Sequence, residues 1–246
     1  MKHLRWQIFL GLSLVLLSAI FYFVHYAIFH DAHHIFTFML GDIAFVPIEV
    51  LLVTLIIDRV LSRREKRSML EKLNMVIGVF FSEIGTDLLI YLSEYDPEAE
   101  KVKGSLVVNQ DWSEQKFSAT SKQLRSYDYG IDSQSGDLKS LRNYLIEKRD
   151  FLLILLENPN LLEHDSFTEL LFAVFHLTEE LSARTDVSQL PETDYAHLSG
   201  DIKRAYVILI REWLDYMEYL KRDYPYLFSL AIRTNPFDKN ASPEVR

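Results

Sequence analysis

Residues Trp6 to Phe29 form a stretch of 24 residues without a single formally charged side chain. At 1.5 Å per residue, an α-helix of this length spans roughly 36 Å, which exceeds a bilayer hydrocarbon core of about 30 Å. A cleaved signal peptide is the alternative, because Lys2 and Arg5 precede the stretch. Its apolar region is usually only about 7–15 residues long and ends in small residues. Here the stretch ends in bulky side chains, so the sequence predicts a retained membrane helix over 6–29.

Charge is distributed unevenly along the chain. Only seven acidic or basic residues lie in positions 1–61, although Asp, Glu, Lys and Arg make up 25% of the 246 residues. This division predicts a first quarter suited to lipid and a remainder suited to water. The absence of cysteine excludes a disulfide scaffold, a thiolate metal site and a cysteine nucleophile. The net charge of −9 argues against a nucleic-acid partner, which requires a basic face.

A second membrane helix is predicted over residues 41–61, with Asp42, Pro47 and Glu49 at membrane depth. The segment 30–40 between the spans, either helical or re-entrant, contains no Lys or Arg, whereas basic residues lie at the end of the second span and directly after it. These are Arg59, Arg63, Arg64, Lys66 and Arg67. The positive-inside rule then places both chain ends in the cytoplasm of a plasma-membrane protein and the short loop outside. The basic residues also suit contact with anionic lipid head groups.

Beyond this membrane hairpin, residues 1–61, the sequence predicts helices, so the expected fold class is all-α. Apolar residues recur every three or four positions along a linker helix over 62–95 and form a seam suited to helix pairing. The seam consists of Leu70, Leu73, Ile77, Phe80, Ile84 and Tyr91. A cytoplasmic helical bundle is expected over 96–233, and a polar tail over 234–246. The bundle's helices are predicted at 112–126 (capped by Asp111), 137–157, 161–184, 195–222 and 226–233, and 96–111 is predicted to be a loop or at most one strand.

Two carboxylates mark the second span. Asp42 and Glu49 are seven residues apart, which places them on one face of a helix about 10 Å apart along its axis. An ionisable residue at membrane depth costs about 2.5–3.5 kcal/mol, so this stripe should face protein or water, as in a cation- or proton-conducting path. Alternatively, Asp42 caps the helix at the interface and Glu49 is protonated and bonded to the first helix. Pro47 is expected to kink the span.

Four histidines and one acid gather near the predicted loop. They are His25, His30, Asp31, His33 and His34. His30 and His34 have the spacing at which imidazoles can share a metal ion on a helix, and His25 could ligate haem. Interfacial histidines also serve as polar anchors or take up protons near pH 6.5. These alternatives stay open.

The remainder of the chain carries imidazoles and carboxylates on predicted helices, among them His164, Glu169, His176, Glu180 and His197. A di-iron bundle uses Glu-x-x-His pairs on facing helices, and this chain has only Asp194-x-x-His197. A solvated acidic face and no cofactor are therefore expected. Phosphate-binding glycine loops, G-x-S-x-G and H-E-x-x-H are absent from the sequence, which predicts no enzymatic activity.

The segments Leu40–Arg59, with Gly41-Asp42 and Pro47-Ile48-Glu49, and Glu71–Gly78 resemble an uncharacterised group of prokaryotic two-span membrane proteins. This resemblance covers about residues 33–90 and implies no activity. The layout of two spans around Leu40-Gly41-Asp42 is also similar to that of two-helix potassium channels. The Thr-Val-Gly-Tyr-Gly filter is missing, and the segment between the spans is too short for a full pore helix plus filter.

The patterns together predict a homo-oligomeric membrane protein, in contact with lipids, for which two functional classes remain. In the first, several hairpins surround a cation path lined by Asp42 and Glu49, and the cytoplasmic bundle regulates the path. In the second, the hairpin only anchors the bundle, which binds a cytoplasmic protein partner.

Overall fold

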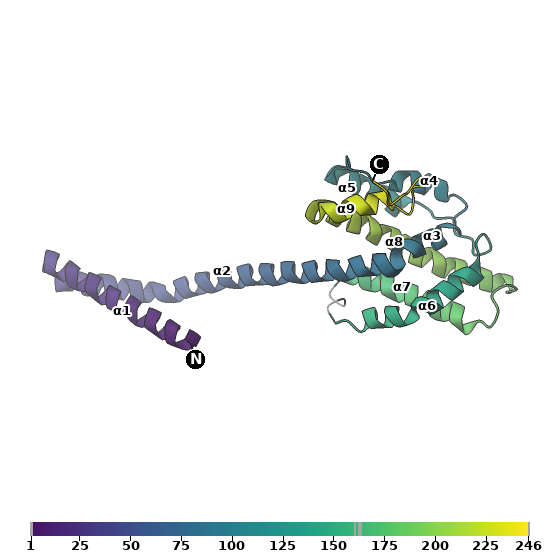
Figure 1. Ribbon diagram of the computed structural model, residues 1–246. Coiled ribbons are helices and arrows are strands. Elements are labelled where there is room, and N and C mark those ends of the chain that lie inside the picture. Colours follow the sequence, from purple (N-terminus) through teal and green to yellow (C-terminus); the bar gives the residue numbers. More distant parts are fainter. Residues whose placement is uncertain (1, 160, 162–163, 246) are drawn as a thin grey trace. The chain divides into compact units, whose positions relative to one another are not determined.

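The computed structural model describes residues 2–159, 161 and 164–245, and all regular secondary structure within these ranges is helical. The predicted all-α fold class is therefore confirmed. The chain divides into two compact units, Met1–Lys66 and Arg67–Arg246 (Figure 1).

The first unit contains α1 (Lys2–Phe29) and the beginning of α2 (Ala32–Phe80). Both helices are long and apolar enough to cross a membrane, and none of the residues in their most apolar windows is buried within the described chain. The segment 30–40, which the sequence left open as helical or re-entrant, is helical from Ala32 onwards. Pro47 lies inside α2 without ending it.

The second unit begins with the end of α2, which continues through a π-helical turn, η1 (Phe81–Gly85), into α3 (Thr86–Ser93). Thr86 supports this turn, because its backbone N–H and its hydroxyl both donate to the carbonyl of Phe81. The predicted apolar seam packs inside this unit: Leu73, Ile77, Phe80 and Ile84 are all buried there, whereas Leu70 is exposed.

The remaining elements of the second unit follow in chain order: α4 (Ala99–Lys103), η2 (Gly104–Leu106), α5 (Glu114–Ser126), α6 (Leu138–Leu156), α7 (Asp165–Ala183), α8 (Glu192–Asp223) and α9 (Pro225–Arg233). The first two are helical turns where the sequence predicted a loop or a strand. Helix α5 begins later than predicted, because the hydroxyl of Ser113, and not Asp111, accepts from the backbone N–H of Lys116. The predicted helices at 137–157 and 226–233 match α6 and α9 to within one residue at each end.

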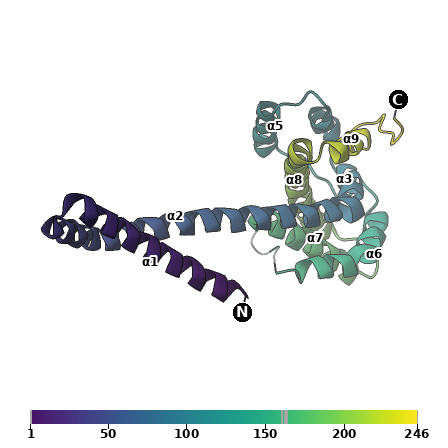
Figure 2. The same ribbon diagram turned by 60° about the vertical axis from the view of Figure 1, so that its left-hand side comes forward.

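Helix α8 forms the centre of the second unit (Figures 1 and 2). It packs against α7, α9, α5 and α3, and α6 packs on the other side of α7. The buried side chains include Phe167 from α7 and Tyr206 from α8. The segment after α9 is anchored as well, because Asn235 and Phe237 are buried. The Asn235 amide donates to the carbonyl of Leu106 at 2.9 Å, which ties the predicted polar tail to η2.

Candidate functional site

The turn between α1 and α2 consists of two residues. His30 adopts a left-handed conformation with φ of 52°, and its N–H donates to the carbonyl of Tyr26 at 2.8 Å. The Asp31 carboxylate accepts from the backbone N–H of His34 at 3.0 Å and so caps the start of α2. This hydrogen bond lowers the pKa of Asp31. Asp31 thus has a structural role at the helix terminus.

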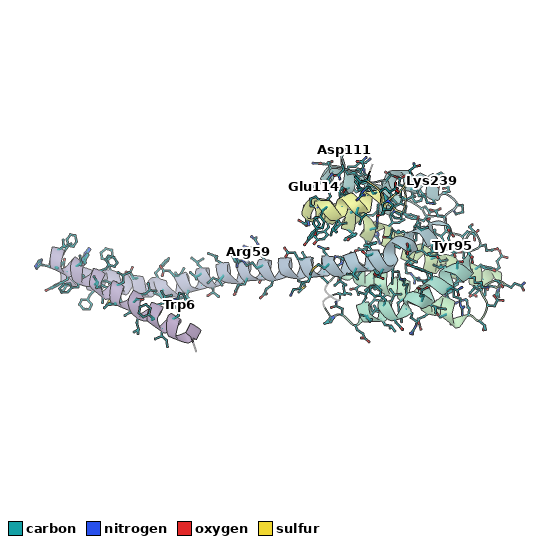
Figure 3. All side chains as sticks on the ribbon, in the orientation of Figure 1. Trp6, Arg59, Tyr95, Asp111, Glu114 and Lys239 are labelled. Atoms are coloured by element: carbon teal, nitrogen blue, oxygen red, sulfur yellow. The ribbon has the colours of Figure 1, made fainter. Side chains whose placement is uncertain are left out.

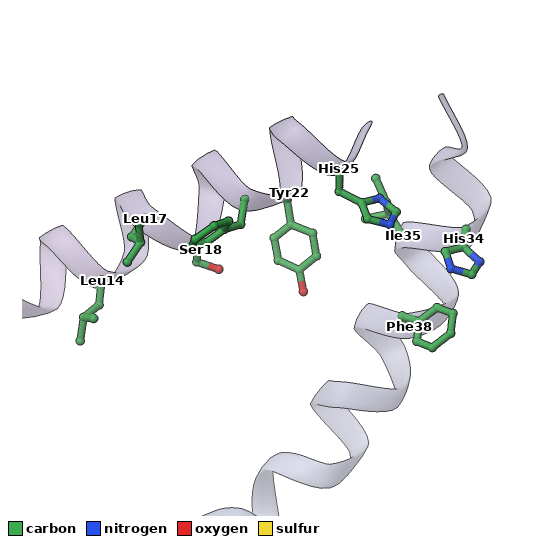
Figure 4. A pocket seen from close by; sticks show the side chains of 9 residues that line it. Leu14, Leu17, Ser18, Tyr22, His25, His34, Ile35 and Phe38 are labelled. Carbon is green, nitrogen blue, oxygen red and sulfur yellow. The ribbon is translucent and has the colours of Figure 1, made fainter. Parts of the chain in front are cut away.

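The structure brings two of the loop histidines together. The rings of His25 and His34 are stacked, with centroids 5.9 Å apart and planes 2° from parallel. They line a cavity of about 620 Å³ between α1 and α2, together with Ser18, Tyr22 and Phe38 (Figure 4). His25 is half-buried, and its Nδ1 has no hydrogen bond within the described residues.

The histidine side chains of the loop do not converge on one point, as a metal site formed by His30 and His34 would require. His30 contacts the ring of Tyr26, with centroids 6.1 Å apart, and His33 is exposed. Among residues 2–159, 161 and 164–245, three or more potential ligand atoms converge only in the second unit.

Asp42 and Glu49 are both exposed in the single chain. Neither side chain forms an ion pair or a hydrogen bond to the described residues, so the predicted bond from Glu49 to the first helix is not observed. The carboxylates lie on one face of α2, because seven residues complete almost two helical turns.

The basic residues after the second span lie along α2. Arg59 extends away from the helix axis (Figure 3), and Arg63 and Arg64 are exposed as well. The side chains of Lys66 and Arg67 fall outside the described part of the structure. The contact of these residues with anionic head groups therefore stays a prediction.

The second unit contains a cluster that the sequence reasoning missed. His176 and Glu180 of α7 meet His197 and Asp201 of α8, with one potential ligand atom from each residue within 4.8 Å of every other. Each pair has i, i+4 spacing, which was a detectable signal. The Glu-x-x-His pattern does not include these pairs, and only the register of α7 against α8 brings the two pairs face to face.

Comparison with known proteins gives two family matches. Residues 1–61 match the N-terminal helical domain of MJ1433, and residues 69–233 match the C-terminal helical domain described as that of the uncharacterized protein MJ1433. The chain is 46% identical over 241 residues to the uncharacterized protein MJ1433 of Methanocaldococcus jannaschii, an alignment that covers 98% of this chain and 97% of that protein. No solved structure matches the chain. The resemblance to a family with no assigned activity is thus confirmed.

Proposed function

We propose that this chain, which belongs to the MJ1433 family, is an integral membrane protein whose hairpins assemble around a cation path lined by Asp42 and Glu49. The observation that carries the proposal is the exposure of both carboxylates on residues 35–57 of α2, a stretch that contains no other charged side chain. Facing lipid would cost about 2.5–3.5 kcal/mol for each ionised group. Neighbouring copies or water around a common axis would remove that cost.

The exposure of the apolar helices supports the membrane location. Trp6, Phe9 and Phe21 on α1 are 63, 72 and 66% exposed, and Leu40 and Ile56 on α2 are 69 and 62% exposed. Side chains of this kind are normally covered by lipid or protein. We place both ends of the chain in the cytoplasm of a plasma-membrane protein, because the basic cluster follows α2's apolar part and the turn at His30 has no basic residue.

The orientation can be tested by cysteine labelling, since the chain contains no cysteine. His33→Cys near the turn should react with a membrane-impermeant maleimide added to intact cells. Gln134→Cys, at an exposed position of the second unit, should react only after lysis. Labelling of Gln134→Cys in intact cells would contradict the proposed orientation.

Ion flux through proteoliposomes tests the path itself. Glu49→Gln removes one carboxylate per subunit and should lower cation flux relative to the wild type. Asp58→Asn is a matched control, because Asp58 lies nine residues along α2 and therefore on the opposite face. Equal flux through the wild type and Glu49→Gln would exclude the path.

A second function is favoured by one feature of α9. Tyr226, Leu227 and Leu230 are 71, 41 and 46% exposed and lie on one side of this helix. This surface suits an apolar protein partner, for which the hairpin would serve as an anchor. Under that function, Tyr226→Ser weakens partner binding and Glu49→Gln leaves it unchanged. Neither proposal assigns catalysis to the chain.

A further inference from the structure

Helices α7 and α8 align two ligand pairs of the second unit. The chain reverses between them, and the two helices lie side by side (Figures 1 and 2). In this antiparallel register His176 lies opposite Asp201, and Glu180 lies opposite His197. Two imidazoles and two carboxylates, one of each from either helix, therefore meet on one face of the pair.

Four N···O distances within this group are 3.3–3.8 Å, and one potential ligand atom from each residue lies within 4.8 Å of every other, which is close to the spacing of ligands around one metal ion. The Nε2 atoms of His176 and His197 lie 3.4 and 3.3 Å from Oδ2 of Asp201. Nε2 of His197 lies 3.5 Å from Oε2 of Glu180. Nε2 of His176 lies 3.8 Å from Oε1 of the same glutamate. Four ligands at about 2.0–2.1 Å from a tetrahedral Zn²⁺ ion lie roughly 3.3 Å from one another.

The same distances are too long for direct charge-assisted hydrogen bonds. Such bonds between an imidazolium and a carboxylate measure about 2.7–2.9 Å. Asp201 is only 3% exposed, and its Oδ2 accepts no hydrogen bond within the described chain. An ionised buried oxygen without a hydrogen bond is costly, and a cation between it and the two imidazoles would remove that cost.

Two arginines hold the carboxylates in place. Arg204 lies 3.2 Å from Oδ1 of Asp201, which leaves Oδ2 directed at the histidines. Arg184 donates to Oε2 of Glu180 at 2.8 Å and also to Asp194 at 2.8 Å. Supporting contacts of this kind orient ligands in metal sites. The histidine side chains are 45 and 50% exposed, which gives an ion access from solvent.

We propose that His176, Glu180, His197 and Asp201 bind a divalent transition-metal ion of the Zn²⁺ class. Two nitrogen and two oxygen ligands suit such ions, whereas Mg²⁺ and Ca²⁺ prefer all-oxygen surroundings. The ion would join α7 to α8 and so stabilise the second unit. This inference goes beyond the cation path in the hairpin, because it involves none of the membrane residues.

Zinc titration of the full chain tests the proposal. The protein is purified in detergent, freed of metal with a chelator, and titrated with Zn²⁺ by calorimetry. Co²⁺ absorption then reports the coordination geometry. We expect one saturable site and a thermal midpoint that rises with Zn²⁺.

Three variants locate the ion. His197→Gln changes a half-exposed side chain and should leave the fold intact while weakening Zn²⁺ binding at least about 100-fold, beyond the 10–100-fold typical of outer-shell partners. Asp201→Asn should have the same effect. His164→Asn is the matched control, because His164 caps α7 outside the cluster, where Asn can also cap, and it should bind Zn²⁺ as the wild type does.

The outcomes separate clearly. Loss of the site in His197→Gln with retention in His164→Asn supports the proposal. Equal binding by the wild type and His197→Gln would place the ion elsewhere, for example at His25 and His34, and would overturn it. An absence of saturable Zn²⁺ binding by the wild type would overturn it as well. The cation path is tested separately, by the cation flux through Glu49→Gln, so either proposal can fail without the other.

Discussion

Gly85 closes the π-helical turn η1, where a methyl group would collide with two aromatic rings. A Cβ atom at this position would lie 2.5 Å from Cδ1 of Phe81 and 2.9 Å from Cε1 of Phe80, and both rings are buried. Neighbouring rings fix them in place: Phe80 meets Phe167 edge-on at 5.3 Å, and Phe81 stacks on Tyr216 at 5.1 Å. We therefore predict that Gly85→Ala destabilises the second unit.

The magnitude follows from two opposing effects. Overpacking a well-packed core costs about 1–3 kcal/mol. Alanine in place of glycine favours a helix by about 0.5–1 kcal/mol. The net loss in the free energy of unfolding is up to about 2.5 kcal/mol, which lowers the thermal midpoint by up to about 10 °C for a unit of this size.

Gly200→Ala provides the matched control. Gly200 lies on α8 with no atom within 4 Å of an added Cβ, so only the helix preference acts, and the midpoint should rise by about 1–4 °C. The assay is thermal unfolding of the full chain in metal-free detergent solution. It is followed by the fluorescence of Trp112 and Trp213, which are both buried in the second unit. A midpoint for Gly85→Ala equal to or above that of Gly200→Ala would refute the reasoning.

Two further changes probe the second unit. Asn235→Ala removes two hydrogen bonds of a buried amide, one donated to the carbonyl of Leu106 and one accepted from the N–H of Phe237. It should lower the free energy of unfolding, measured with urea, by about 2–4 kcal/mol. An unchanged urea midpoint would contradict this. Burial raises the pKa of Glu212, so the folded state binds the proton of this carboxyl more tightly than the unfolded chain does. The protonated carboxyl therefore favours the folded state at low pH, and this contribution to the free energy of unfolding is lost as the pH rises above about 4. Glu212→Gln should therefore gain stability over the wild type in thermal melts between pH 4 and 7, and a pH-independent difference would count against the burial argument.

Local signals in the sequence were sufficient for most of the helices. Asp137 caps α6, with its carboxylate accepting from the N–H groups of Lys139 and Ser140, and Pro225 begins α9. Such signals act within a few residues of a helix end, so they can be recognised without knowledge of the fold. The family resemblance likewise rests on two segments that are each continuous in the sequence, Leu40–Arg59 and Glu71–Gly78.

Features that depend on packing could not be predicted in the same way. The turn η1 has no single-residue signature, because it is stabilised by rings that pack against α7 and α8. The i, i+4 spacing within each helix is visible in the sequence, but the cluster that contains His176 and Asp201 also depends on the register of α7 against α8. No local signal in the sequence sets that register. Asn235 bonds to Leu106 across 129 positions of the chain, so the predicted tail could not be recognised as part of the core.

The bond between Asn235 and Leu106 also has a consequence for protein synthesis. In a nascent chain that extends only to the end of α9, the Leu106 carbonyl lacks this partner. Trp213 also lacks the ring of Phe237, whose centroid lies 5.0 Å from its own in the complete unit. Completion of this unit therefore waits until residues 235–237 have been synthesised. A premature stop shortly before position 235 would release a product with an incompletely closed core, which is a substrate for cellular proteases.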